Sequence, residues 1–499
     1  MPSDAILTDA PLDVLILGAG ISGIGAGHYL RTEHPSKSFA ILESRPRPGG
    51  TWDLFKYPGI RSDSDLNTFG YEFKPWLDPQ AIADAPRIVD YLHEAISEDR
   101  LDEKIVYNRR AVGMDWSEPD QLWNVTVRRT DSDGDDDAFT VQARWVFAGT
   151  GYYNYDEGFT PEFPGRERFT GRIVHPQHWP EDLDYRGKRV VVIGSGATGV
   201  TLVPSMADDA AHVTMLQRTP TYVIPVPRED VISDAMKKVL GERRGYALSR
   251  KKNILQQKAL YNFCQKYPRP ARAIIRGINK AFLPRDFDVD THFNPPYNPW
   301  DQRLCVVPNG DLFKAIKKGS ASIETGRIAT FTETGILLED GRELSADIIV
   351  TATGLNLQLF GGMEITVDGE PVNFADTTAY RGMMLSGLPN FAMAIGYTNS
   401  SWTLKVGLLC EYFCRVLSYQ DANGYTSVRA VEPEGLEKRP LLDFGAGYVK
   451  RALDRLPKQG TVSPWTMTMA VASDVKQLRN GEIVDEFLDY RKAPATAVV

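Results

Sequence analysis

Two glycine-rich loops of the same spacing constrain the fold of this chain more than any other feature. The loop Gly18-Ala-Gly-Ile-Ser-Gly23 follows the largely apolar run 13–17, and Gly194-Ser-Gly-Ala-Thr-Gly199 follows the apolar run 190–193. At such a strand-to-helix turn the backbone can approach a pyrophosphate, whose charge the helix N-terminus stabilises. Because both loops follow strands, we prefer this interpretation to turns without a ligand. We expect an α/β protein with two Rossmann-like dinucleotide-binding domains, whose loops bind through Gly18, Gly20, Ser22, Gly23, Gly194, Gly196, Thr198 and Gly199.

The residues at the end of the next strand distinguish the two units. Glu43 closes the apolar run 39–42, roughly twenty residues past the first loop, where a carboxylate accepts hydrogen bonds from ribose hydroxyls. After the second loop, the equivalent run 213–216 leads to Arg218 and Thr219, which suit a 2′-phosphate. We therefore expect FAD in the first unit and NADPH in the second. Two dinucleotides imply an electron transfer inside the protein.

Composition agrees with a large globular enzyme. The 499 residues are 42% hydrophobic and 24% charged, which suits two or three domains. No apolar segment reaches the roughly twenty residues that span a bilayer, and the acidic N-terminus does not resemble a secretion signal. We expect a cytoplasmic protein that binds no nucleic acid.

The four cysteines exclude one class of flavoprotein. Cys264, Cys305, Cys410 and Cys414 are too few and too scattered for a disulfide framework, and we expect no metal site. A flavin disulfide reductase needs a redox-active pair soon after the first glycine loop, where this chain has no cysteine. Dithiol chemistry is therefore excluded.

A basic stretch from about 228 to 285 interrupts the second unit and is predicted to be helical. We favour a solvated face on an inserted helical subdomain; steering of NADPH or contact with an acidic membrane surface is the secondary interpretation. After residue 391 we expect the chain to return to the first sheet, so that two connections join the units and permit rotation between them. The expected organisation is 1–151 and 355–499 for the FAD-binding domain, 152–222 and 299–354 for the NADPH-binding domain, and 223–298 for the helical insert.

Irregular motifs carry a family resemblance. The segment Phe169-x-Gly171-x-x-x-His175-x-x-x-Trp179-Pro180 resembles the fingerprint of type I Baeyer-Villiger monooxygenases, and GGTWDLFKYPGIRSD, residues 49–63, resembles their other signature. Tryptophan at Trp179 favours the ketone-oxidising branch over relatives that oxygenate only nitrogen and sulfur. The likeness covers nearly the whole chain. It is most detailed toward those members that activate the thioamide ethionamide, through segments such as YNPWDQRLCVVPNGDLF and GYTNSSWTLK.

This resemblance implies roles for particular side chains. Arg303 matches the family's active-site arginine, whose permanent charge would keep a C4a-peroxyflavin anionic. Asp63 matches the carboxylate that orients this arginine and lies beside the cofactors, although Asp63 or Asp65 could instead cap the following helix. We interpret His175 and Trp179 as structural residues at the seam between the domains. Further flavin contacts are expected from Gly50, Thr51, Trp52, Asn399 and Trp402.

The implied reaction inserts one oxygen atom of dioxygen into a ketone, giving an ester or a lactone, with sulfoxidation as an additional activity. Gln302 stands where many relatives carry a lysine that holds the 2′-phosphate, so the preference for NADPH over NADH is expected to be weaker. Two alternatives remain open: a sulfur- or nitrogen-oxygenating enzyme acting on thioethers or thioamides, and a nucleotide-dependent sensing protein without turnover. The natural ketone or sulfide, the selectivity and the oligomeric state stay undetermined.

Overall fold

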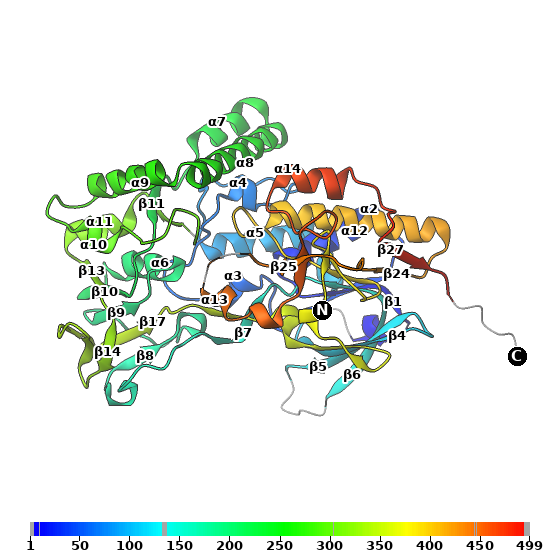
Figure 1. The fold of residues 1–499 in the computed structure, drawn as a ribbon, viewed down its shortest axis with the longest axis horizontal. Coiled ribbons are helices and arrows are strands. Elements are labelled where there is room, and N and C mark those ends of the chain that lie inside the picture. The colour runs from blue at the N-terminus through cyan, green and yellow to red at the C-terminus, as the bar shows by residue number, and fades with distance from the viewer. Residues whose placement is uncertain are drawn as a thin grey trace, which may run out of the picture.

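The structure is a computed structural model that describes residues 4–8, 10–131, 137–302, 304–443, 445 and 447–493. It contains two units that lie side by side (Figure 1), the first built on a mixed sheet and the second on a parallel one. Among the described residues, no helix combines the length and the apolar character that crossing a membrane requires. The α/β fold class with two Rossmann-like units, predicted from the sequence, is confirmed.

The first sheet is built around strands that are buried on both faces. In β1 (Leu12–Leu17), Val14 and Ile16 face one apolar core, and Leu15 and Leu17 face another. Such two-sided burial is expected for parallel strands that are covered by helices. The helices α2 (Ile21–Glu33), α5 (Ala85–Glu98) and α12 (Thr403–Asn423) cover the first of these faces. The strand order is β20 (Glu370–Pro371), β19 (Glu364–Val367), β4 (Arg109–Ser117), β5 (Leu122–Arg129), β6 (Ala138–Ala148), β1, β2 (Phe39–Leu42) and β3 (Ile105–Val106), and β23 (Phe391–Met393) also pairs with β6.

The second sheet is entirely parallel and sits at the left of Figure 1. Its core is rich in valine and isoleucine, which suit strands buried on both faces. Helices α6 (Ala197–Met206) and α11 (Asp311–Lys318) pack on it. The strand order is β13 (Ala321–Thr325), β10 (His212–Gln217), β9 (Arg189–Ile193), β17 (Ile348–Thr351) and β8 (Arg172–Val174). A separate antiparallel sheet, between β13 and β17 in the chain, consists of β14 (Ile328–Phe331), β15 (Gly335–Leu338) and β16 (Glu343–Ser345).

Two connections join the units, and they pair with each other. β7 (Tyr153–Gly158) leaves the first sheet, and β18 (Leu355–Leu357) returns from the second, as an antiparallel pair. After β18, strands β19 and β23 rejoin the first sheet. The two units are therefore linked by a two-stranded ribbon rather than by two separate loops.

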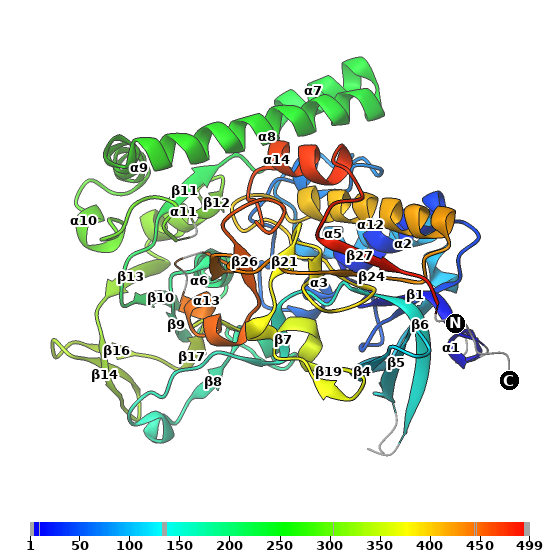
Figure 2. The same ribbon diagram turned by 45° about the vertical axis from the view of Figure 1, so that its right-hand side comes forward.

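The inserted segment forms a long arm above both units (Figure 2). Its helices are α7 (Val231–Leu240), α8 (Glu242–Lys266), α9 (Pro268–Phe282) and α10 (Val289–His292). The first residues of the expected helical insert instead form strand β11 (Val223–Val226), which pairs in parallel with β12 (Cys305–Pro308). Here the β-branched run Val-Ile-Pro-Val favours a strand over a helix.

The C-terminal part of the chain completes the first unit through small strand pairs and short helices. β24 (Ser427–Ala430) pairs with β27 (Leu488–Arg491), close to the hairpin that joins β4 to β5. The remaining α-helices and strands of this unit lie in both parts of the chain. They are α1 (Ala5–Thr8), α3 (Thr51–Leu54), α4 (Leu66–Phe69), α13 (Gly447–Lys450), α14 (Val471–Asp474), and strands β21 (Ala379–Tyr380), β22 (Met384–Leu385), β25 (Lys438–Pro440) and β26 (Lys458–Gly460).

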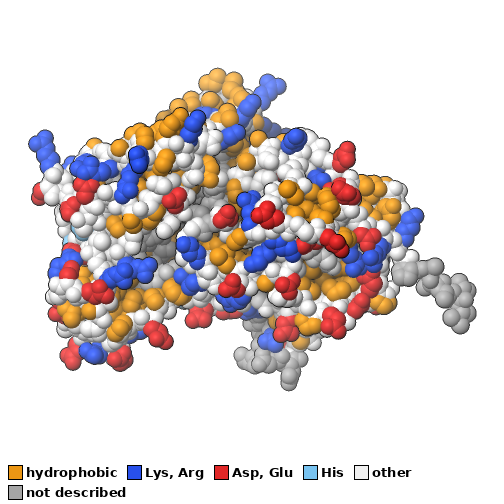
Figure 3. Space-filling view, in the orientation of Figure 1, with side chains coloured by type: hydrophobic (Ala, Val, Ile, Leu, Met, Phe, Trp, Pro, Cys, Tyr) orange, Lys and Arg blue, Asp and Glu red, His pale blue; other side chains and the backbone are white. Residues whose placement is uncertain are grey.

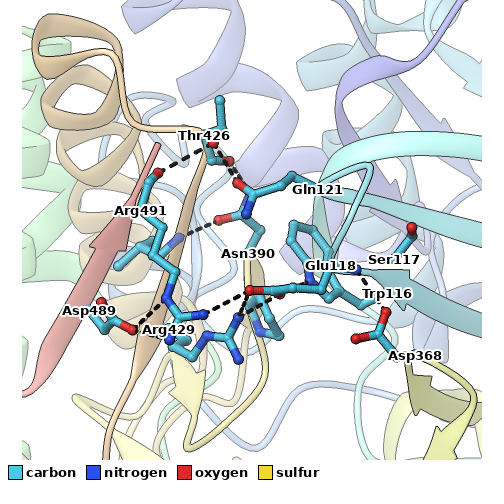
Figure 4. Close-up of polar contacts among 12 residues, drawn as sticks. Trp116, Ser117, Glu118, Gln121, Asp368, Asn390, Thr426, Arg429, Asp489 and Arg491 are labelled. Atoms are coloured by element: carbon cyan, nitrogen blue, oxygen red, sulfur yellow. Dashed lines mark hydrogen bonds and ion pairs between the residues drawn. The ribbon is translucent and has the colours of Figure 1, made fainter. Parts of the chain in front are cut away.

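Glu118, in the turn between β4 and β5, fastens this C-terminal pair to the sheet (Figure 4). Its carboxylate accepts hydrogen bonds from Arg429 at 2.6 Å, from Arg491 at 2.8 Å and from the Trp116 indole at 2.7 Å. Partial burial alone would raise the pKa of Glu118, but the indole and the two guanidinium groups outweigh it and lower the pKa. The charged form of Glu118 therefore stabilises the fold.

Replacing this carboxylate should loosen the C-terminal pair. We expect Glu118→Gln to lower the free energy of unfolding by about 1–2 kcal/mol near pH 7, as measured by urea denaturation. Because the folded-state pKa of Glu118 is lowered, its contribution is complete above the unfolded value and is lost as the pH falls through the folded one. The difference from wild type should therefore shrink below about pH 4. Glu370→Gln, on the exposed edge strand β20, should have no comparable effect.

Candidate functional site

A cavity of about 1510 Å³ lies between the two units. The strands β1 and β9 both end at it, and each is followed there by its glycine loop. Ligands of open α/β sheets bind beyond the carboxyl ends of the strands, so this edge is the expected position for a dinucleotide in each unit.

The first loop and Glu43 form one end of the cavity. Gly18 has a φ of +94°, and Gly20 caps α2, whose first N–H groups open onto the cavity. The buried Glu43 carboxylate accepts hydrogen bonds from the backbone N–H groups of Ala19 at 2.8 Å and Arg45 at 3.0 Å. Burial raises the pKa of Glu43. A carboxylate has about four lone-pair sites, so Glu43 can hold the loop and still accept hydrogen bonds from a ligand.

The GGTW segment lies against this loop. The Gly49 N–H donates to the Ala19 carbonyl at 2.9 Å, and a Cβ on Gly50 would lie 3.2 Å from the Gly20 Cα. Thr51 is hydrogen-bonded to the Tyr155 hydroxyl at 2.9 Å, and burial raises the pKa of Tyr155 to about 12. Gly50, Thr51 and Trp52 all line the cavity. The site thus joins two segments that are about thirty residues apart in the sequence.

The late segment at the start of α12 closes the same region. The Trp402 indole N–H donates to the Ser22 hydroxyl at 2.9 Å, so these two predicted cofactor contacts lie together on the cavity wall. Asn399 donates from its side chain to the Met469 carbonyl at 3.1 Å. Its amide oxygen is buried and has no hydrogen-bond partner among the described residues. A buried acceptor of this kind, on the wall of a cavity, indicates a ligand that donates to it.

The second loop and the end of β10 form the opposite end of the cavity. Gly194 has a φ of +121°, and Gly196 caps α6. Arg218 and Thr219 are exposed and line the cavity, and Arg218 makes no ion pair with any described residue. Thr198 also lines it. A guanidinium without a carboxylate partner remains available for an anionic group such as a phosphate.

The third glycine of each loop is absent from the cavity wall, and its contact with a cofactor stays a prediction. A Cβ on Gly23 would overlap the Gly18 carbonyl oxygen, and a Cβ on Gly199 would overlap the Gly194 carbonyl oxygen. Both glycines therefore permit close packing of a helix against its own loop. Their contribution to binding is indirect, through the position of the helix N-terminus.

Of the two predicted catalytic residues, Asp63 lies within the described residues and Arg303 does not. Asp63 is half-buried and lines the cavity. Asp65, its alternative as a helix cap, does cap α4: it accepts from the Thr68 N–H at 3.1 Å and also from Asn253 and Gln257 of α8. Arg303 lies outside the described residues, whereas Gln302 and Leu304 line the cavity.

Arg61 is a cavity residue that the sequence reasoning passed over. It is 6% exposed, and its Nη1 atom donates to Asp311 of the second unit at 2.5 Å. Its Nε and Nη2 atoms are buried and have no partner among the described residues. Arg61 belongs to the GGTW signature and stands two residues before Asp63. This position in the motif is the sequence signal that could have predicted Arg61 as a site residue. A second overlooked residue, Arg45, fastens that signature by donating to Gly50 at 3.1 Å and pairing with Asp53 at 2.5 Å.

His175 and Trp179 lie away from the cavity wall. The His175 ring accepts from the Gln177 N–H at 3.2 Å and donates to the Gly354 carbonyl at 3.2 Å. Burial lowers the pKa of His175, which favours the neutral ring that this pattern requires. The ring also packs against Gly158, where a Cβ would overlap it. His175 therefore contacts both connections between the units.

Comparison with known families and proteins agrees with this geometry. Residues 83–364 match the flavin-binding monooxygenase-like family, and residues 16–77 match the NAD(P)-binding Rossmann-like domain. The chain is 51% identical over 486 residues to the FAD-containing monooxygenase EthA of Mycobacterium tuberculosis, covering 97% of this chain and 98% of that protein. It is 46% identical over 488 residues to the probable FAD-binding monooxygenase AlmA of Acinetobacter baylyi, covering 97% of each.

Solved structures share the fold at lower identity. An oxidized steroid monooxygenase bound to NADP superposes with a TM-score of 0.78 at 22% identity, covering 97% of this chain and all of that one. A cyclohexanone monooxygenase bound to ε-caprolactone gives a TM-score of 0.74 at 20% identity, covering 96% of this chain and all of that one. At these identities the likeness concerns the fold.

Two alanine substitutions in the second loop should separate packing from binding. Gly199→Ala places a methyl group against a carbonyl and should cost about 1–3 kcal/mol of stability in urea denaturation. Gly196→Ala meets no atom within 4 Å and should cost less than about 1 kcal/mol. Because Gly196 lines the cavity, its added methyl should instead raise the KM for NADPH. An unchanged KM for Gly196→Ala would mean that no pyrophosphate lies on this loop.

Proposed function

The chain belongs to the flavin-binding monooxygenase-like family, and we propose that it is an FAD- and NADPH-dependent Baeyer-Villiger monooxygenase that converts ketones to esters or lactones. The observation that carries the proposal is the single cavity onto which both glycine loops, Asp63 and Arg218 open. Electrons from one dinucleotide can reach the other only if their reactive rings meet, and a shared cavity meets that requirement.

The residues on the wall fit the two cofactors. Glu43 can accept from the ribose of FAD, and the free amide oxygen of Asn399 can accept from a donor on the flavin side. Arg218 and Thr219 can hold the 2′-phosphate of NADPH. FAD, when bound, would supply electron transfer and oxygen activation, which the described side chains cannot supply themselves.

The protein side chains would control charge and water. We propose that Arg303 supplies a permanent positive charge at the reacting oxygen and that Asp63 orients it. Arg61 would add a second cation, since two of its buried nitrogens have no partner among the described residues. The cavity wall beside Asp63 includes the mostly buried rings of Phe55 and Tyr57, which would keep water away.

The stoichiometry of the proposed reaction provides a quantitative test. One oxygen atom enters the ketone, the other leaves as water, and NADPH supplies two electrons, so one ester should form for each NADPH consumed. The FAD-loaded protein should give this ratio with an aliphatic ketone. Arg303→Ala should still reduce its flavin with NADPH but form ester roughly 100-fold more slowly. The assay is chromatography of the product alongside NADPH absorbance.

Other outcomes of this assay select the alternatives. Products from sulfides or thioamides alone would indicate a sulfur- or nitrogen-oxygenating enzyme, which the names of the relatives also allow. Protein that retains no flavin and consumes no NADPH would indicate a sensing role. Sulfoxidation in addition to ester formation agrees with the proposal, because the same oxygen donor can react with a soft sulfur atom.

Arg218 tests the assignment of the second unit. We expect Arg218→Ala to raise the KM for NADPH about 10- to 100-fold and to change the KM for NADH little, because only NADPH carries the 2′-phosphate. The matched control is Arg186→Ala, an arginine of the same unit whose side chain is 76% exposed and pairs only with Asp184 among described residues. Equal effects on both nucleotides would remove the 2′-phosphate assignment.

A further inference from the structure

Large apolar side chains are exposed on the outer face of α7, α8 and α9. In Figure 3 orange and blue side chains gather together along the upper edge of the molecule, over these helices. The most exposed of them is Val239, at 80%, and Leu255 is 57% exposed. The outer face, as used below, comprises Val231, Ile232, Val239, Leu240, Leu248, Leu255, Tyr267 and Ile274, which make up most of the exposed large hydrophobic residues in the described chain.

The buried side of α8 is unusually polar for a surface helix. Its inner face carries buried polar residues: Arg250 donates to the carbonyls of Thr68 at 2.9 Å and Gly70 at 2.7 Å, and Asn253 donates to Asp65 at 2.7 Å. A helix on a soluble protein places its apolar side inward and its polar side in water. Here hydrogen bonding holds the helix down, and Leu248 and Leu255 are exposed.

Exposed cations flank the outer face; two of the nearby acids are paired, and Glu242 is exposed. Asp230 pairs with Lys252 at 2.7 Å and Asp234 with Lys237 at 3.0 Å, so these carboxylates add little to the field. The whole chain has a formal charge of −8, and this face is a local exception. The exposed basic residues of the three helices and their junctions are Lys238, Arg243, Arg244, Lys251, Lys258, Lys266, Arg269 and Lys280.

The outer face adjoins the rim of the cavity. Leu260 is 43% exposed and also lines the cavity, together with Gln257 one helical turn before it. Gln257 contacts Asp65 at 2.7 Å and Ser400 at 2.8 Å, so this part of α8 is fixed to the flavin-side segment. A surface that covers the leucines would therefore lie beside the entrance to the site.

We propose that the outer face of α7–α9 docks onto an anionic lipid bilayer, without crossing it. Outward apolar side chains ringed by lysine and arginine are what an interfacial helix presents to lipid head groups. A second copy of this chain fits less well, because a two-fold contact would bring two cationic faces together. Docking would place the rim of the cavity at the lipid surface, where apolar substrates are concentrated.

Vesicle binding tests the docking without any turnover, so it can fail independently of the proposed function. The FAD-loaded, full-length protein is sedimented with vesicles of phosphatidylglycerol and phosphatidylcholine in equal parts, or of phosphatidylcholine alone. We expect at least about tenfold stronger binding to the anionic vesicles, weakened in high salt. The double variant Val239→Asp/Leu255→Asp should lose at least about tenfold of this binding.

The matched control carries the same change on another surface. Val431 and Val462 are 48% and 57% exposed and lie outside the arm, so Val431→Asp/Val462→Asp should bind vesicles as wild type does. Lys251→Glu/Lys258→Glu should remove the preference for anionic lipid. Equal binding by all variants would overturn the proposal, because another surface would then be responsible. Light scattering that shows a dimer dispersed by Leu255→Asp, without vesicle binding, would assign the face to self-association. A monomer that binds neither vesicle would leave an acidic protein as the partner.

Discussion

The first turns of helices α2 and α6 pack against their own glycine loops so closely that Gly23 and Gly199 leave no room for a side chain. Gly23 and Gly199 meet the carbonyls of Gly18 and Gly194 where a Cβ would overlap them. This close packing aims the N–H groups at each helix N-terminus into the cavity, where phosphates would bind. The glycines that matter most for position are thus the ones that do not touch the cavity.

The inserted arm connects the units in a way that the chain order conceals. It is inserted into the second unit, but Arg250, Asn253 and Gln257 of α8 bond to residues 65–70 of the first. Asp65 is central to this connection, since it both caps α4 and accepts from α8. Beside this polar inner face, Leu248 and Leu255 of α8 remain exposed. One set of hydrogen bonds therefore explains both the anchoring of the arm and its unusual surface.

The seam between the units combines hydrogen bonds with apolar packing. His175 bonds to Gly354 on one connection and packs against Gly158 on the other, and the two connections pair as β7 and β18. Apolar side chains also join the units, because Phe55 and Tyr57 pack into the core of the second unit and Leu357 of β18 packs into a core of the first. The structural interpretation of His175 and Trp179 agrees with their distance from the cavity wall. The catalytic role of Arg303 stays a prediction of the sequence, because that residue lies outside the described part of the chain.

The sequence by itself determined the fold class, the two glycine loops and the family, because strand-loop-helix patterns and long irregular motifs are local and survive without neighbours. It also identified Glu43, Trp402 and Arg218 by their places at strand ends and in motifs. Only the tertiary structure decided that Gly23 and Gly199 serve packing, that Asp65 caps a helix and holds the arm, and that Arg61 lies buried on the cavity wall. It likewise revealed that Leu248 and Leu255 of α8 are exposed. The physical reason is that burial and hydrogen-bond partners depend on segments far apart in the chain, such as 65–70 and 250–257, whose meeting no local pattern records.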